Sequence, residues 1–263
     1  MVRHEDEDGA HEGFGPPQVP AVLSLDVGHT VLFPRTSIGD TYAEVVEAEA
    51  GIVVDGRCVD AAFSQAWHRE KARAEGLVYG RTHADAVRFW RAIVSDVMSG
   101  ILTLEDQTGV LEAVTGRLYD EFSHAHRWRV DDGFGPLVSA ARRFGMKVVL
   151  TSNWDLRLRG LLVEMDLLRA VDALVVSAEE GVEKPASALF LRAAAAVGAT
   201  PSTVLHVGDT WEEDVAGALS AGMRAAWVNP LGLAKPEPDG QVLSIRSVGD
   251  LTEILAGGGG GLE

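Results

Sequence analysis

The sequence has little cysteine and no long apolar run. Of its 263 residues only Cys58 is a cysteine, so the chain forms no internal disulfide and no cysteine-based metal cluster. The neighbours of Cys58 match no nucleophile pattern, which favours a structural thiol. No window of eighteen uninterrupted apolar residues occurs, and the first residues are acidic, which argues against a membrane span and a secretory signal. We expect a cytoplasmic protein.

Positive charge is also scarce. Lys and Arg total 23 against 39 Asp and Glu, a formal net charge of −16. Nucleic acids and anionic membranes are bound mainly through Lys and Arg, so we expect neither as a partner. Lysine is especially rare, at four positions: Lys71, Lys147, Lys184 and Lys235. Apolar residues still make up 46%, enough for a sizeable core, and the length suits one large domain or one domain carrying a smaller one.

The ends of the chain and its first half differ in pattern. Residues 1–20 are acidic and rich in Gly and Pro, and we expect a disordered tail there. Residues 257–263 contain five consecutive glycines and are expected to be flexible. Residues 21–25 form a short apolar run typical of a buried strand. From residue 37 to residue 126 apolar residues recur near a spacing of 3.6, which predicts helices.

After residue 130 helical patterns alternate with short apolar runs. We predict helices over residues 134–144, 156–165, 186–197, 213–221 and 248–255, and strands over residues 147–151, 173–176, 203–207, 224–228 and 243–245. This alternation predicts an α/β fold with a Rossmann-like parallel sheet core. We assign residues 21–33 and 130–256 to that core, and residues 34–129 to an inserted all-helical cap domain.

Several polar residues follow predicted strands or precede the next helix. Ligands of open parallel sheets bind beyond the carboxyl ends of the strands, so side chains at these positions should meet at one edge. The residues concerned are Asp26, Ser152, Asn153, Lys184, Asp209 and Asp214. Each alone has an ordinary interpretation as a helix cap, a turn residue or a solvated charge. Their coincidence at one edge favours a catalytic site.

These residue types suit phosphate chemistry with a metal ion. Asp26 and Asp209 offer the hard oxygen ligands that Mg²⁺ prefers. A carboxylate at a strand end can also attack phosphorus or carbon and form a covalent intermediate. Lys184 would neutralise the charge that two acids and a phosphate accumulate. Ser152 and nearby backbone N–H groups would donate to phosphate oxygens.

The order of these motifs resembles the haloacid dehalogenase superfamily, in the branch with a helical cap between the first and second motifs. The resemblance covers roughly residues 21–256 and is most specific in the stretch GDTWEEDVAGALSAGM, residues 208–223. It implies a mobile cap and, usually, Mg²⁺-dependent hydrolysis of a phosphate ester through an aspartyl-phosphate. Carried over by position, Asp26 is the nucleophile. The implied phosphate ligands are Ser152, Asn153 and Lys184, and the implied metal ligands are Asp26, the backbone carbonyl of Gly28, Asp209 and Asp214.

One position departs from this family's phosphatases. They usually carry a second Asp two residues after the nucleophile, and this chain has Gly28 there, followed by His29. The missing carboxyl transfers protons to the leaving group and from water, a contribution of about 10²–10⁴-fold. His29 could take its place as a catalytic acid, since histidine titrates near neutrality. A good leaving group, as in a sugar 1-phosphate or an acyl phosphate, would need little protonation.

Three functions stay open. The first is a Mg²⁺-dependent phosphatase of a small phosphorylated metabolite, acting as a monomer or homodimer. The second is a 2-haloacid dehalogenase; those enzymes also lack the second Asp and have a Ser-Asn motif, but they need no metal. They generally replace the acid at the position of Asp209 with a neutral residue, so Asp209 favours the phosphatase. The third is a catalytically impaired member that binds a ligand, an option that Gly28 keeps open.

The cap would decide the substrate, and two clusters of residues are candidates. One cluster is Trp67, His68, Arg69, Lys71 and Arg73, and the other is Arg81, His83, Arg88, Trp90 and Arg91. Arginine facing the cleft could bind a second carboxylate or phosphate, and tryptophan could stack on a sugar or base. Solvated helix faces and core tryptophans are the alternative interpretation. The sequence identifies no substrate.

Overall fold

A computed structural model describes residues 19–74, 76–100, 107–234 and 242–256. Six strands form one sheet in the order β5-β4-β1-β6-β7-β8, and every neighbouring pair is parallel. Their bounds are β1 Val22–Leu25, β4 Lys147–Ser152, β5 Ala173–Val176, β6 Val204–Gly208, β7 Arg224–Val228 and β8 Val242–Ile245. The predicted Rossmann-like parallel sheet is confirmed.

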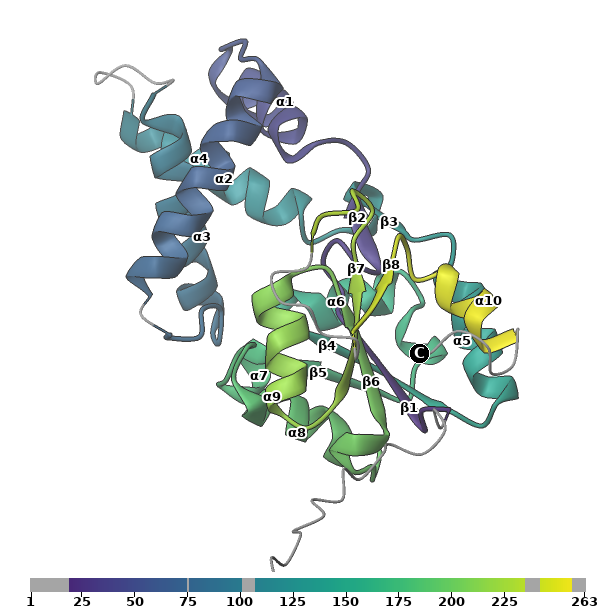
Figure 1. Cartoon of the computed structure of the whole chain (residues 1–263). Helices are drawn as coiled ribbons and strands as arrows, with labels where there is room; N and C mark the ends of the chain where they lie inside the picture. The colour runs from purple at the N-terminus through teal and green to yellow at the C-terminus, as the bar shows by residue number, and fades with distance from the viewer. Residues whose placement is uncertain (1–18, 75, 101–106, 235–241, 257–263) are drawn as a thin grey trace, which may run out of the picture.

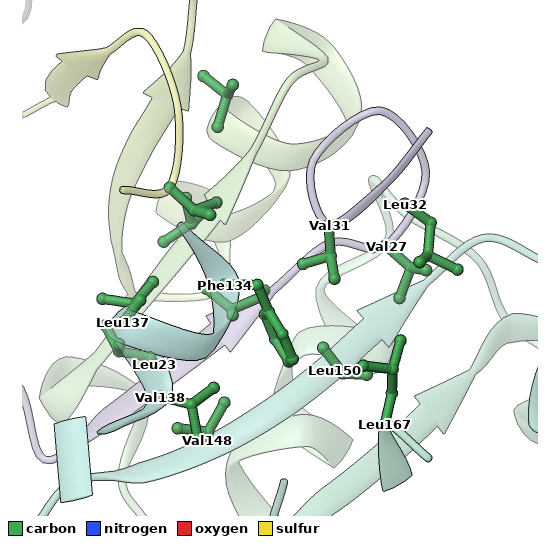
Figure 2. Packing of buried hydrophobic residues seen from close by; sticks show 14 of the residues in the cluster. Leu23, Val27, Val31, Leu32, Phe134, Leu137, Val138, Val148, Leu150 and Leu167 are labelled. Carbon is green, nitrogen blue, oxygen red and sulfur yellow. The ribbon is translucent and has the colours of Figure 1, made fainter. Parts of the chain in front are cut away.

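Helices cover both faces of this sheet, because alternate side chains of each buried strand point to opposite sides. Leu23 and Leu25 of β1 enter one hydrophobic cluster, and Val22 enters the other. Figure 2 shows the first cluster, where Phe134 and Leu137 pack near Leu23. In Figure 1, α8 and α9 lie on one side of the sheet and α5 and α10 on the other. The bounds are α5 Phe134–Arg143, α6 Arg157–Glu164, α7 Ser177–Glu180, α8 Ser187–Ala196, α9 Gly217–Ser220 and α10 Asp250–Ala256.

Four further helices lie apart from the sheet, at the upper left of Figure 1. They are α1 Ile38–Ala50, α2 Gly56–Arg73, α3 His83–Met98 and α4 Gln107–Glu121. Ser37 and Thr82 cap α1 and α3 by accepting from the backbone N–H three residues on. The apolar faces of the four helices share a third hydrophobic cluster, which includes Val46, Ile93 and Val114. This helical insertion therefore has a core of its own.

Two short strands join the helical insertion to the sheet. β2 (Leu32–Pro34) and β3 (Trp128–Val130) pair antiparallel, so the chain leaves and re-enters the core side by side. The sequence pattern does not predict them, because three residues are too few to show a period. The prediction of helix over residues 213–221 was also wrong in detail. Trp211–Ala216 form a π-helical turn and only the following residues, α9, are α-helical.

Some expectations lie outside the described residues. The tail predicted over residues 1–20 falls there except for its last two residues, and so does the tail over residues 257–263. The helical pattern predicted from residue 37 to residue 126 includes residues 75 and 101–106, which are likewise outside. Among the described residues no helix has the length and apolarity to span a membrane.

Candidate active site

The carboxyl ends of β1, β4 and β6 lie together because these strands are neighbours in the sheet. Asp26 directly follows β1, Ser152 is the last residue of β4, and the turn after β6 carries Asp209 and Asp214. A cavity of about 680 Å³ opens at this edge. Every site residue expected from the sequence lines it: Asp26, Gly28, His29, Ser152, Asn153, Lys184, Asp209 and Asp214.

Lys184 is bonded to two of the carboxylates. Its Nζ donates to Asp26 Oδ1 at 2.6 Å and to Asp214 Oδ1 at 2.5 Å, and the side chain is only 2% exposed. Burial alone would lower the pKa of Lys184, but the charges of Asp214 and Asp26 outweigh it and raise that pKa above its usual value. Lys184 is therefore positively charged and fixes the position of Asp26.

The positive charge of Lys184 does not fully neutralise the negative charge of the acids around it. Burial and the charges of Asp214 and Asp209, opposed by Lys184, raise the pKa of Asp26 to about 7. Burial and Asp214 also raise the pKa of Asp209. Burial alone would do the same at Asp214, but Lys184 and a hydrogen bond from His206 hold its pKa below the usual value. One lysine thus balances only part of the charge of three acids.

The three carboxylates suit a small divalent cation. Asp26, Asp209 and Asp214 each offer one oxygen, and these oxygens all lie within 4.8 Å of one another. Gly208 permits this approach, since a Cβ there would lie 2.2 Å from Cγ of Asp214. Thr30 Oγ1 donates to Asp209 Oδ1 at 3.4 Å and orients it. Clustered carboxylates with excess negative charge are the donor set that Mg²⁺ prefers.

Asn153 holds two neighbouring segments together. Its Oδ1 accepts from the backbone N–H of Lys184 at 2.7 Å, and its Nδ2 donates to the Lys184 carbonyl at 3.0 Å and to Glu213 Oε2 at 2.9 Å. These bonds tie the end of β4 to the loop of Lys184 and to the turn after β6. Ser152 is 2% exposed and lines the cavity beside it.

A buried polar network beneath the site has no counterpart in the sequence analysis. Ser24 Oγ lies 2.9 Å from Thr151 Oγ1 and 2.9 Å from His206 Nδ1, and His206 Nε2 lies 3.3 Å from Asp214 Oδ1. Burial lowers the pKa of His206, which favours the neutral imidazole. The network supports Asp214 from behind. Its one sequence signal is a histidine in the middle of an apolar strand.

The loop after Asp26 carries Gly28 and His29. His29 has a positive φ of 56°, a conformation that costs free energy for a residue with a side chain. Its exposed ring lines the cavity and contacts the edge of Phe33, with ring centroids 6.1 Å apart. A Cβ at Gly28 would lie 3.5 Å from the indole of Trp154. Beyond the chain neighbours of Gly28, the described side chain nearest to that Cβ position is therefore an indole.

The two cap clusters separate in the structure. Trp67, His68, Lys71 and Trp90 line the cavity. Four arginines are not among its lining residues and instead pair with carboxylates of the helical insertion: Arg69 with Asp96, Arg73 with Glu70, Arg88 with Asp85 and Arg91 with Glu112. Both tryptophans of these clusters thus line the cavity, whereas most of the arginines lie on the surface.

Comparison with known proteins gives consistent matches. A family model described as haloacid dehalogenase-like hydrolase matches residues 25–222. Haloacid dehalogenase-like hydrolase domain-containing protein 3 of Mus musculus is 28% identical over 78% of this chain and 80% of its own length. Phosphoserine phosphatase of Thermus thermophilus is 33% identical over 58% of this chain and 60% of its own length. A magnesium-bound hydrolase of Bacillus subtilis has the same fold, with a TM-score of 0.67, 18% identity, and coverage of 91% of this chain and 100% of its own.

Proposed function

Because the chain belongs to the haloacid dehalogenase-like hydrolase family, we propose that it is a Mg²⁺-dependent phosphatase of a small phosphorylated metabolite. The observation that carries the proposal is the contact of Lys184 with Asp26 and Asp214 inside a cluster of three carboxylates. Asp26 is a buried nucleophile beside the positively charged Lys184, and the three carboxylates together can bind a metal cation. This arrangement suits the transfer of a phosphoryl group. The phosphatases among the relatives support the same class of reaction.

In the proposed mechanism Asp26 is the nucleophile. Its carboxylate oxygen bonds to phosphorus while the ester P–O bond breaks, and the electron pair leaves on the substrate oxygen. Lys184 favours the ionised form of Asp26 against burial and the neighbouring acids, and it fixes the position of that side chain. It also neutralises charge on the phosphoryl oxygens, together with the Ser152 hydroxyl and the backbone N–H of Asn153. Water then attacks phosphorus of the aspartyl-phosphate and gives up a proton to solvent, while the bond from phosphorus to Asp26 breaks. Phosphate leaves and Asp26 is restored as a carboxylate.

The metal ligands in this proposal are Asp26, the backbone carbonyl of Gly28, Asp209 and Asp214. The bound ion would supply neutralisation of the charge on the phosphate oxygens. Asp214 has the further task of holding Lys184, while Thr30 steadies Asp209. Lys184 bonds Oδ1 of Asp26, which leaves Oδ2 for the attack on phosphorus.

The site lacks the usual carboxyl that would transfer a proton to the leaving group. Gly28 supplies no acid, and His29 is the candidate because it directly follows Gly28 in the chain and its ring lines the same cavity. We propose His29 as the acid for poor leaving groups; good leaving groups need none. The rate on unactivated substrates should be low accordingly.

A dehalogenase is the second candidate, and Gly28 is the observation that favours it. Attack of Asp26 on carbon would expel halide, which needs no proton donor. Asp209 counts against this function, since an acid cluster without a cation is costly in a buried site. A binding protein with an impaired site is the third candidate, and the intact contacts of Lys184 count against it.

The test is release of phosphate from a panel of activated and unactivated phosphomonoesters, with Mg²⁺ and with chelator. We expect turnover that chelation abolishes and that Asp26→Asn lowers by about 10³-fold or more. The control is Asp132→Asn, which removes an exposed carboxylate that does not line the cavity. Halide release from a 2-chloroacid that chelator leaves unchanged would replace the phosphatase with the dehalogenase. Binding of Mg²⁺ and phosphate without turnover would favour the binding protein.

A further inference from the structure

The part of the cavity above the acid cluster is walled by aromatic rings. We propose that the body of the substrate is an uncharged aromatic group, so that the protein hydrolyses aryl monophosphates. This inference rests on the phosphatase function proposed above and adds the substrate class. It is carried by the ring walls, by the charges around them, and by the side chain that faces Gly28.

The rings come from both the helical insertion and the core. Trp67 and Trp90 line the cavity from α2 and α3, with ring centroids 5.8 Å apart. Trp128 and Trp154 line it from β3 and the loop after β4, with centroids 5.2 Å apart. Each ring is held by a neighbouring ring, so a flat substrate would stack on them at little further cost in side-chain entropy. Rings on both sides of one cavity suit an aromatic body.

The charged groups of the cavity disfavour a second anionic group on the substrate. Six carboxylates line the cavity against three Lys and Arg side chains. The six are Asp26, Asp60, Asp209, Glu212, Glu213 and Asp214. Each of the three cations is already paired: Lys71 with Glu183 at 2.8 Å, Arg157 with Asp155 at 2.7 Å, and Lys184 with the acid cluster. A carboxylate or second phosphate on the substrate would meet repulsion and find no free Lys or Arg among the lining residues.

A cationic substrate is disfavoured as well. The Arg157 guanidinium lies over the Tyr119 ring at 3.9 Å and over the Trp90 ring at 5.3 Å. Lys71 Nζ lies 5.3 Å from the centroid of Tyr79. Protein cations therefore already use ring faces that an ammonium group would need. Thr115 Oγ1 is a buried lining hydroxyl without a partner among the described residues, and an uncharged polar substituent is the kind of group it could bond.

The position of Gly28 points to the same substrates. Beyond the chain neighbours of Gly28, Trp154 is the described side chain closest to the Cβ that Gly28 lacks, so a leaving group there meets an indole where a carboxyl would supply a proton. A phenol ionises with a pKa of about 10, whereas an aliphatic alcohol is close to water at about 15.7. An aryl oxygen therefore departs as phenolate when the P–O bond breaks and the bond from Asp26 to phosphorus forms. The phenolate then takes a proton from solvent.

The experiment measures kcat and KM for matched phosphomonoesters in the presence of Mg²⁺. We expect phenyl and 1-naphthyl phosphate to be preferred, with a lower KM for the larger ring system. Benzyl phosphate should keep a similar KM but lose kcat by about 10²-fold, because it has an aromatic body and a poor leaving group. Added charge should raise KM about tenfold, comparing 4-carboxyphenyl with 4-methylphenyl phosphate. Preference for phosphocholine, phosphoserine or the carboxylated ester would overturn the proposal.

Substitutions of the lining tryptophans distinguish binding of the aromatic group from the phosphoryl-transfer step. Trp67→Leu and Trp154→Leu should each raise KM for 1-naphthyl phosphate about three- to tenfold and leave KM for acetyl phosphate unchanged. Phe144→Leu is the control, because Phe144 is an exposed ring outside the cavity. If the two tryptophan variants raised KM for acetyl phosphate as much as KM for 1-naphthyl phosphate, an aromatic subsite would be contradicted.

Binding without turnover keeps the two proposals distinguishable. Calorimetric titration of the wild-type protein with 1-naphthol should show saturable binding that Trp67→Leu and Trp154→Leu weaken and Phe144→Leu does not. If naphthol binds in this way but no phosphate ester is hydrolysed, the phosphatase function fails and the aromatic site stands. If phosphate esters are hydrolysed but naphthol does not bind, the aromatic body is wrong and the phosphatase stands.

Discussion

At the residue scale, Gly28 stands where related phosphatases carry a carboxyl, so the loop after Asp26 has no acid at that position. A Cβ at this position would make an ordinary contact with Trp154 at 3.5 Å, so a carboxyl can be introduced without a clash at Cβ. We expect Gly28→Asp to raise kcat on alkyl phosphates by about 10²-fold, because it restores an acid for the leaving group. Aryl phosphates should gain little. Phosphate release is the measurement.

The matched control for this prediction is Gly28→Asn. Asparagine has nearly the same shape as aspartate but transfers no proton. An equal gain in kcat from both substitutions, or a gain of tenfold or less from Gly28→Asp, would contradict the account of a missing acid. Loss of activity in both would show that the loop needs glycine for its conformation.

Residues at strand ends could be predicted from the sequence, and residues that act through distant partners could not. Asp26 and Asp209 were found because a parallel sheet gathers the residues that follow its strands. Arg157 and Trp90 contact each other and both bond Asp155, although Trp90 lies far along the chain from the other two residues. Nothing in the local pattern indicates such a contact. The sequence offered Trp67 and Trp90 as candidates for stacking, but only the fold brings them into one cavity with Trp128 and Trp154.

At the scale of elements, α1 and α2 approach closely through two glycines. A Cβ at Gly39 would lie 1.8 Å from the carbonyl oxygen of Gly56, which a side chain can relieve only by moving the helices apart. We expect Gly39→Ala to lower the free energy of unfolding by about 1–3 kcal/mol, as overpacking does. Gly116→Ala in α4 is the control, because no atom lies within 4 Å of its Cβ position.

The two glycine substitutions should act in opposite directions. Gly116→Ala is expected to stabilise by about 0.5–1 kcal/mol, since alanine favours a helix interior. Urea unfolding followed by circular dichroism measures both. Equal small effects at the two positions would contradict the close contact between α1 and α2.

A second element-scale contact joins the end of α4 to the turn before β3. Burial would raise the pKa of Glu121, but hydrogen bonds from Arg127 and His126 outweigh it and hold that pKa below its usual value of 4.5. A lowered pKa in the folded state means that Glu121 stabilises the fold above pH 4.5 and that this contribution is lost as the pH falls through the lowered value.

We therefore expect Glu121→Gln to destabilise the protein by about 1–3 kcal/mol at neutral pH, because Arg127 loses a charged acceptor. The difference from wild type should shrink below pH 4.5 as Glu121 becomes protonated in the wild-type protein. Unfolding at a series of pH values is the measurement. A difference that stays constant down to pH 2 would rule out the ionised pair as its source.

Long periodic elements were predicted better than short or irregular ones. The helices of the insertion follow from apolar residues at 3.6 spacing, and four to six apolar residues suffice to indicate each buried strand of the sheet. β2 and β3 have three residues each, which is below the length at which a pattern can be read. The turn at Trp211–Ala216 is π-helical where it positions Asp214, so a helical pattern was present but its geometry was not predictable.

At the scale of the whole molecule, the helical insertion is held on the core by a few polar contacts. Trp90 Nε1 donates to buried Asp155 at 2.8 Å, and Lys71 Nζ bonds both carboxylate oxygens of Glu183 at 2.8 Å. The three hydrophobic clusters divide between the sheet and the insertion, except that Phe122 packs against one cluster of each. Alternating strands and helices predict this architecture, but the placement of the insertion depends on pairs far apart in the sequence.

The Lys71–Glu183 pair should contribute to closing the cavity. Its side chains are 18% and 15% exposed, so it is screened less than a surface pair. We expect a double-mutant cycle with Lys71→Gln and Glu183→Gln to give a coupling of about 1–2 kcal/mol in unfolding. KM for an aryl phosphate should rise severalfold in each single variant, because the open form of the insertion becomes more populated.

The Lys147–Asp172 pair is the matched control. It lies wholly within the sheet part of the molecule, away from the insertion, and its side chains are 57% and 27% exposed. Its coupling should stay below about 1 kcal/mol, as for other exposed pairs, and its loss should leave KM unchanged. If both cycles change KM equally, the effect reflects general loss of stability. If the Lys71–Glu183 cycle alone changes KM, the pair links the insertion's position to substrate binding, as expected of contacts that cross from α2 to the core.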